Sequence, residues 1–232
     1  MTAGSNLFGK MTAALPAHLA GHPKDAVDLR SDVAAILGPL AAITVEEFTN
    51  PAASGAAALK AATATTVAPA TVLTAGLLAP GVAILAAQAR NITFTTAGGT
   101  AADAPATALI TGTRGGVAQT ETVTLAQTAT VAVGVKLWNT VTSIVYAAAD
   151  GTGATVAIGI GDSMPLTYTP KARAGLAAIV KEIAVGAVVT TGTLSVTNKS
   201  YTPAAAPDGT KDWAIFYEYD PSVLSAASTG GT

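Results

Sequence analysis

The clearest pattern in the chain is a series of short β-branched runs between residues 90 and 166, separated by Gly, Asp and Asn. Runs rich in Val, Ile and Thr, bounded by turn formers about every ten residues, are typical of a sandwich or barrel. The pattern predicts a mainly β fold, an antiparallel β-sandwich or barrel-like domain with an extended, partly helical N-terminal arm.

The first half of the chain contains several further strand candidates. Residues 43–48 alternate like a strand. Residues 71–74 and 82–85 are predicted strands on either side of an Ala-Pro-Gly turn at 79–81. Ile92 and Phe94 share one face of the next strand and Thr93 and Thr95 the other, which predicts a half-buried strand.

Two hairpins are predicted in the central region. Residues 109–113 and 120–125 flank Arg114-Gly115-Gly116, where glycine tolerates a hairpin turn, although the turn type stays open. Residues 141–147 and 155–160 flank a second glycine-containing turn at 150–153. Val156, Ile158 and Ile160 point to one side and are predicted core, as is Trp138.

The C-terminal region ends in a strongly alternating strand. Residues 188–196 are a strand candidate interrupted at Gly192, whereas Leu176, Ala178 and Val180 suit either a strand or a helix. In residues 213–219, Trp213, Ile215, Tyr217 and Tyr219 share one face, and Ala214, Phe216 and Glu218 the other. This strand is expected to be central and packed on both faces.

The N-terminal region is small, turn-rich and weakly patterned. Residues 1–25 read either as an arm that lies on something else or as a frayed terminus. A short helix is predicted within 25–40, and residues 52–64 read as a second short helix or a linker. The expected division is an arm over 1–63, a β core over 64–170, a C-terminal β segment of the same or a second domain over 171–220, and a flexible tail over 221–232.

Composition indicates a surface covered by partners. Only 11% of the residues are charged, against about a quarter in typical globular domains, while 50% are hydrophobic. Such a surface belongs either to a poorly soluble monomer or to a protein that buries it against partners, and we favour partners. The net charge of −2 argues against nucleic-acid binding, and the absence of Cys removes disulfides and thiolate metal sites.

Neither a membrane span nor a signal peptide is predicted. Residues 61–89 are uncharged, but they contain several Thr, two Pro and two Gly, which argues against a span. The N-terminal residues lack the basic region and unbroken apolar run of a signal peptide.

The chain carries no recognisable catalytic motif. His18 and His22 have helical metal-ligand spacing, but Pro16 and Gly21 break that helix and no third ligand is near. Asp150-Gly-Thr-Gly and Gly-Ile-Gly-Asp162 offer oxygen ligands, but their spacing matches no calcium loop. The carboxylates that could serve a glycosidase fall mostly at predicted turns or exposed positions: Glu46, Glu47, Glu121, Asp150, Asp162, Glu182, Asp212, Glu218 and Asp220. We expect no enzyme, cofactor or metal site.

Residues 90–220 resemble a group of tailed-bacteriophage virion proteins that are similar to capsid decoration, or cement, proteins. The resemblance rests on a Thr111-Gly112 turn, on Glu121 before a β run, on a core strand at 141–144, on the Gly159-x-Gly161-Asp162 end, and on the link at 201–209. It implies a virion structural protein, made in the bacterial host cytoplasm, on the capsid surface. The implied partners are the major capsid protein and other copies of the chain, a homotrimer being favoured.

Two other classes of function stay open. A tail-tube or head-fibre subunit would also be a virion part, although no fixed-period repeat and no stripe of one charge sign is present. A glycan-binding or glycan-cleaving β protein would need a cleft with paired carboxylates if it cleaved its ligand.

Overall fold

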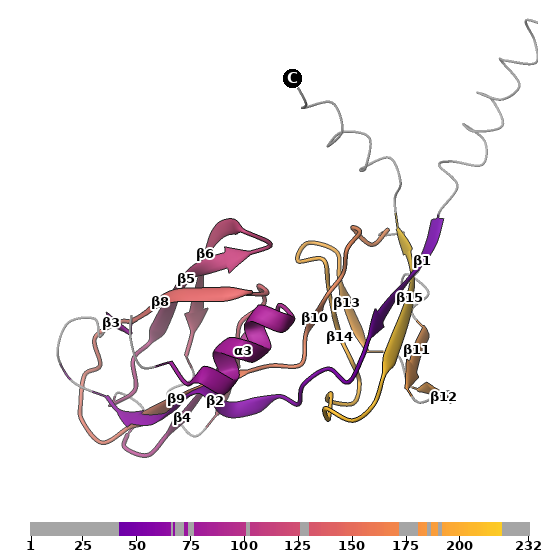
Figure 1. Ribbon diagram of the computed structural model, residues 1–232. Helices are drawn as coiled ribbons and strands as arrows, with labels where there is room; N and C mark the ends of the chain where they lie inside the picture. Colours follow the sequence, from indigo (N-terminus) through magenta and orange to yellow (C-terminus); the bar gives the residue numbers. More distant parts are fainter. Residues whose placement is uncertain are drawn as a thin grey trace, which may run out of the picture. The chain divides into compact units, whose positions relative to one another are not determined.

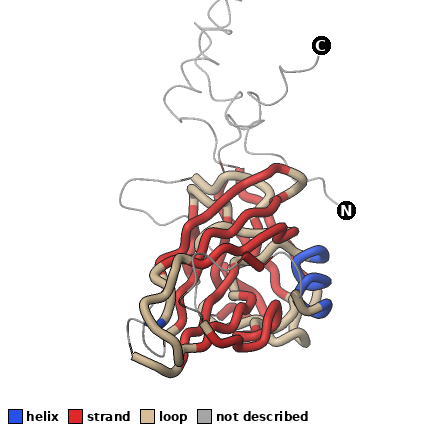
Figure 2. The backbone as a smooth tube through the Cα atoms, turned by 90° about the vertical axis from the view of Figure 1, so that its left-hand side faces the viewer, coloured by secondary structure: helices blue, strands red, loops and turns tan. Residues whose placement is uncertain are grey.

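The computed structural model describes residues 42–65, 67, 72–73, 77–100, 103–125, 130–171, 181–184, 187–189 and 192–219. Its elements lie in the compact unit Ile43–Asp220, with Ala42 as the first residue of β1. Residues 1–41 of the predicted N-terminal arm, the short helix predicted within 25–40, residues 176–180 and the tail fall outside these ranges, whereas residues 42–63 of the arm are described. Figure 2 shows that strands dominate the described chain.

Two four-stranded sheets form what we call the two-sheet body (Figure 1). The strand order is β2-β9-β4-β7 in one sheet and β3-β8-β5-β6 in the other, and all neighbours are antiparallel. The strands are β2 (Gly55–Ala64), β3 (Val72–Leu73), β4 (Ile92–Ala97), β5 (Thr107–Arg114), β6 (Val117–Thr124), β7 (Val131–Val133), β8 (Thr140–Tyr146) and β9 (Thr155–Ile160). The prediction of a mainly β fold of antiparallel sheets is confirmed.

Apolar side chains from both sheets meet in one core. Phe94 on β4, Ile110 on β5, Ile144 on β8 and Ile158 on β9 are fully buried and belong to a single cluster. Trp138 is buried in the same cluster, as predicted. Each such side chain contributes about 1.5–3 kcal/mol through burial, so alternation along the strands drives the two sheets together.

The first predicted hairpin is confirmed and its turn type is now defined. β5 and β6 pair up to Arg114 opposite Val117, which leaves Gly115 and Gly116 as a two-residue loop. Their φ angles are 56° and 81°. Positive φ at both central residues is the mark of a type I′ turn, whose twist matches that of the strands.

The second predicted hairpin is wrong. β8 pairs with β3 and β5, whereas β9 pairs with β2 and β4 in the other sheet. The connection between β8 and β9 therefore crosses from one sheet to the other. The two strands do not pair, because each is hydrogen-bonded to a different strand along both of its edges. The predicted core face of β9 is correct, since Val156, Ile158 and Ile160 are at most 1% exposed.

Two alanine-rich segments have structures other than those predicted. Residues 55–64, predicted as helix or linker, form strand β2, whose Leu59 enters the core. Residues 82–85, predicted as a strand, lie in the helix α3 (Ala79–Ala87). Alanine favours a helix, as α3 shows, but in residues 55–64 pairing with β9 overrides that preference.

Two finer predictions also need correction. β4 is buried on both faces near its start, because Thr93 is only 8% exposed and the strand lies between β9 and β7. Thr111 and Gly112 form no turn but lie inside β5, where the register with β8 shifts. A Cβ at Gly112 would lie 2.0 Å from the carbonyl oxygen of Thr140, so this irregularity requires glycine.

The remaining strands form two further sheets. Their orders are β1-β15-β11-β12 and β10-β14-β13. The strands are β1 (Ala42–Phe48), β10 (Met164–Pro165), β11 (Lys181–Ala184), β12 (Ala187–Val189), β13 (Thr193–Ser195), β14 (Ser200–Thr202) and β15 (Trp213–Tyr219). The strand predicted at 43–48 is confirmed, and the one predicted at 188–196 is two strands in different sheets.

β15 is an interior strand, as predicted, between β1 and β11. Trp213, Ile215 and Tyr217 are at most 3% exposed on one face, whereas the opposite face is half-buried. The expectation of full packing on both faces is therefore met on one face only. Ile215 and Tyr217 share a second, smaller core with Met164, Leu166 and Tyr201.

Candidate interaction surface

The helix α3 follows an extended residue, Leu78, and carries Pro80 in its first turn, where proline is tolerated. It ends at Gln88, whose backbone N–H donates to the carbonyl of Ile84 at 2.9 Å. Leu85 is 1% exposed and anchors the helix in the core of the two-sheet body. Gly81 permits close approach, since a Cβ there would lie 2.3 Å from the carbonyl oxygen of Ala58 on β2.

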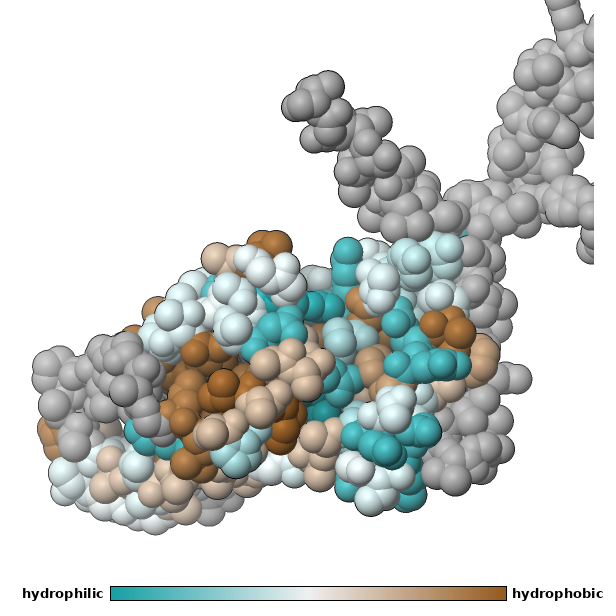
Figure 3. All heavy atoms as spheres, in the orientation of Figure 1, coloured by the Kyte–Doolittle hydropathy of each residue, from teal (hydrophilic) through white to brown (hydrophobic). Residues whose placement is uncertain are grey.

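The outward side of α3 has no polar side chain. All nine residues of the helix are apolar or glycine, and most are exposed. Leu78 and Val82 are 42% and 45% exposed, beside exposed alanines at 79, 83, 86 and 87. Figure 3 shows the resulting hydrophobic patch where α3 lies in Figure 1. We call Leu78, Val82 and these alanines, with Pro80, the α3 face.

An open groove of about 830 Å³ borders the α3 face. Ala83 and Ala87 line one side, and Glu46, Glu47 and Phe48 of β1 line another. The Glu46 carboxylate is hydrogen-bonded within the fold, because its Oε1 accepts from the Thr167 backbone N–H and the Tyr217 hydroxyl, both at 2.9 Å. Glu47 is exposed, and Arg114 also lines the groove, so the groove combines apolar residues of α3 with charged side chains of both signs.

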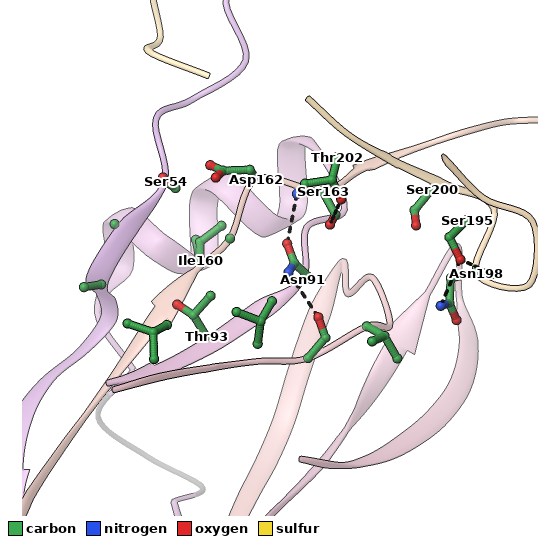
Figure 4. A pocket seen from close by; sticks show the side chains of 17 residues that line it. Ser54, Asn91, Thr93, Ile160, Asp162, Ser163, Ser195, Asn198, Ser200 and Thr202 are labelled. Atoms are coloured by element: carbon green, nitrogen blue, oxygen red, sulfur yellow. Dashed lines mark hydrogen bonds between the residues drawn. The ribbon is translucent and has the colours of Figure 1, made fainter. Parts of the chain in front are cut away.

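A second groove, of about 530 Å³, is lined by small polar side chains together with Val131, Val133, Val135 and Ile160 (Figure 4). The Asn91 side chain donates to the Gly134 carbonyl at 3.1 Å and accepts from the Ser163 N–H at 3.0 Å. The hydroxyls of Ser163 and Thr202 lie 2.7 Å apart. These groups satisfy one another, and no histidine lines the groove to activate Ser163 as a nucleophile.

The catalytic candidates that the structure describes do not form a cluster of titratable side chains. Among the residues that the structure describes, no group of three or more His, Asp or Glu side chains is placed to bind a metal. Glu121 caps the 134–136 segment, accepting from the Val135 N–H at 2.6 Å, and Asp212 accepts from the Asn50 N–H at 2.9 Å. Glu218 is half-buried on β15 and takes part in interactions. His18, His22 and Asp220 lie outside the described residues, as does the side chain of Glu182.

Of the two suggested oxygen-rich loops, the one ending at Asp162 lines the second groove, and Oδ1 of Asp162 is buried without a hydrogen-bond partner among the described residues. Asp150 is exposed in the loop between β8 and β9. A Cβ at Gly151 would lie 1.8 Å from Oδ1 of Asp103, so the Asp103 carboxylate packs where a side chain would otherwise stand. Asp103 also accepts a hydrogen bond from the Thr100 N–H at 2.6 Å. Asp103 was not among the sequence candidates, because a single Asp in a loop carries no distinctive spacing.

Two arginines that were not predicted to be functional residues have defined hydrogen-bond partners. Arg90 is fully buried and donates to the carbonyl oxygens of Gly161 and Ala52. Burial lowers the pKa of Arg90, and the nearby charge of Asp162 opposes that shift. Arg114 donates to the carbonyls of Asn198 and Lys199, and burial lowers its pKa as well.

No family model, no curated protein and no solved structure matches the chain. Among the described residues, no helix is long and apolar enough to cross a membrane.

Proposed function

We propose that this chain is a tailed-bacteriophage virion structural protein that binds the outside of the capsid shell and stabilises it by bridging shell subunits. Its partners in this proposal are the major capsid protein and other copies of itself, a trimer being the favoured assembly. In this proposal the protein acts only by binding and catalyses no reaction. It is made in the bacterial host cytoplasm and is located on the capsid surface.

The observation that carries the proposal is the α3 face. A helix with no polar side chain is normally buried on all sides, because its surface gains nothing from contact with water. Here only Gly81 and Leu85 are buried within the chain, and the rest of the helix is wholly or partly exposed. An exposed apolar patch of this kind indicates an interaction surface.

The binding free energy of such a contact is modest for one copy but is repeated across a shell. Burial of about 300 Å² at roughly 25 cal/mol per Å² gives an upper bound of about 7.5 kcal/mol, part of which is lost to the entropy of association. A ligand that binds only the assembled shell stabilises that state by mass action. Repeated over many copies, modest contacts would therefore raise the resistance of the shell to rupture.

A matched pair of substitutions tests the proposal. Val82→Asp places a charge on the α3 face, whereas Val117→Asp places one at the tip of the β5–β6 hairpin, where Val117 is 70% exposed. Both sites are exposed, so both variants should fold. The measurement is co-sedimentation with expanded empty capsids that lack this protein, compared with free shell subunits.

Wild type and Val117→Asp are expected to bind expanded shells but not free subunits, and Val82→Asp to lose at least about tenfold in affinity, which corresponds to about 1.4 kcal/mol. Equal binding by both variants would exclude the α3 face. Failure of the wild type to bind shells, or electron-microscopic density for it only in the tail, would exclude decoration.

The two alternatives have distinct signatures in the same preparation. A tail-tube subunit would assemble into rings by itself, and a head fibre would project as a stalk. A glycan-cleaving protein would release sugars from host polysaccharide. Neither groove contains an exposed aromatic platform of two or more rings, and the second contains no aromatic residue at all, so the described grooves favour neither sugar binding nor cleavage.

A further inference from the structure

The outer side of the β3-β8-β5-β6 sheet presents a grid of uncharged side chains. Antiparallel registers place Thr122, Leu109 and Val145 in one row across β6, β5 and β8, and Thr120, Thr111 and Ser143 in the next. We call the outward residues of these three strands the threonine face. They are Thr107, Leu109, Thr111, Thr113, Ala118, Thr120, Thr122, Thr124, Thr140, Ser143 and Val145.

The threonine face is accessible along its whole extent. None of its residues is buried, and Leu109 at its centre is 40% exposed. The residues on either side of Leu109, Ala108 and Ile110, point inward and are fully buried. The strand β5 is therefore packed on one side and open on the other, where an unusual share of β-branched residues meets solvent.

The chemistry of this face is self-complementary. A hydroxyl group both donates and accepts hydrogen bonds, so a threonine can pair with another threonine, as Thr113 and Thr140 already do at 2.7 Å between their oxygens. A two-fold contact between two copies uses the same patch on both, so the patch must be complementary to itself in shape and charge. A face bearing Lys or Glu would bring like charges together, and this face bears neither.

The size of the face sets the strength of such a contact. Three strands about 4.8 Å apart and about seven residues long cover roughly 350 Å² on each copy. The total of roughly 700 Å² is below the 1,200 Å² or so of a stable complex between free proteins. The contact would be weak in solution and effective where copies are already held side by side.

We propose that two copies of this chain pair through their threonine faces in a two-fold contact, with the sheets stacked about 10 Å apart. This proposal rests on the proposed function in one respect: pairing matters where copies are held side by side on a shell. A two-fold contact joins copies in pairs, so it would link neighbouring trimers and would not close a trimer.

Cross-linking tests the geometry directly. The chain has no cysteine, so Thr111→Cys introduces a unique thiol at the centre of the face. A short bismaleimide should join two such thiols at high protein concentration. Thr152→Cys, in the exposed loop between β8 and β9, is the matched control. We expect dimers to form at least about tenfold faster from Thr111→Cys, and equal rates would overturn the proposal.

A charge swap provides the second measurement. Thr111→Lys and Thr111→Glu should each abolish the concentration-dependent association of the full chain in sedimentation, and an equimolar mixture should restore it. Unchanged self-association of either variant alone would overturn the pairing. Circular dichroism checks that both variants fold.

Shell binding separates this proposal from the proposed function. If Thr111→Lys binds shells while its self-association is lost, both proposals are supported. If wild type pairs in solution but binds no shell, the pairing stands and the decoration role fails.

Discussion

At the scale of single residues, the least expected feature is a fully buried arginine. Arg90 donates from Nε and Nη2 to the Gly161 carbonyl at 2.9 and 2.7 Å, and from Nη1 to the Ala52 carbonyl at 3.0 Å. It thereby ties the end of β9 and the segment before β2 to the start of β4. Arginine is rarely fully buried, and Gly161 lies 71 positions away, so sequence patterns could not reveal this role.

Replacement of Arg90 should be costly. Arg90→Met keeps most of the volume but leaves buried carbonyl oxygens without donors, and we expect a loss of about 2–4 kcal/mol of unfolding free energy. Arg114→Gln, at a half-buried site, should cost about 1 kcal/mol. Urea denaturation measures both. Equal losses for the two variants would show that Arg90 is not the more important of these anchors.

At the scale of elements, the features that depend on a short stretch of sequence were predicted correctly, whereas the pairing of strands distant in the sequence was not. The β5–β6 hairpin follows from two adjacent glycines between alternating runs, all within a few residues. The supposed β8–β9 hairpin failed because alternation shows which face of a strand is buried but not which strand lies beside it. The β2 segment failed because its pairing with β9 overrides the helix propensity of its alanines, and the α3 segment failed because a Val-Ala-Ile-Leu run was read as a strand although alanine favours a helix.

The glycine turn gives a prediction at this scale. Gly115 and Gly116 have positive φ, and a Cβ at either would meet nothing within 4 Å. Gly115→Asn should change stability by less than about 0.5 kcal/mol, because asparagine tolerates this conformation, whereas Gly116→Ala should cost about 1 kcal/mol. Thermal unfolding checks the pair. Equal effects would contradict a type I′ turn.

At the scale of the whole molecule, the described chain contains two separate cores, each with a buried tyrosine. Tyr146 packs in the core of the two-sheet body, edge-to-face with Phe94 at a centroid distance of 6.2 Å, and Tyr217 belongs to the smaller core. Burial raises the pKa of both hydroxyls above the usual value of 10.0. Tyr217 also donates to Glu46, whereas the Tyr146 hydroxyl has no hydrogen-bond partner in the part of the chain that the structure describes.

These tyrosines predict a loss of stability at alkaline pH. Above about pH 10 the unfolded chain releases the phenolic protons while the folded chain retains them, so the folded state is disfavoured as pH rises. The contribution is fully present below pH 10 and falls by up to about 1.4 kcal/mol per pH unit for each tyrosine. Urea midpoints between about pH 8 and pH 11 measure the slope.

Tyr146→Phe and Tyr217→Phe should each make that slope shallower. If both do so in a single transition, the two cores unfold together. A slope unchanged by either substitution would contradict ionisation-linked unfolding.

The location of the candidate interaction surfaces was not predictable from the sequence. Low charge and abundant Ala and Thr indicated a chain whose exterior meets partners, but they gave no location. The α3 face exists because helix formation places Val82 outside and Leu85 inside, which the predicted strand would not have done. The threonine face exists because the registers of β5, β6 and β8 align their outward positions.

The amino-acid sequence alone determined the mainly β class, the core-facing positions of the central strands and the β5–β6 hairpin, because each depends on alternation or turn chemistry within a short window. The tertiary structure decided which strands are neighbours, which alanine-rich segment is a helix and which arginine is buried. Those outcomes depend on competition among distant segments for the same hydrogen-bonding edges and the same apolar volume, and no local pattern records that competition.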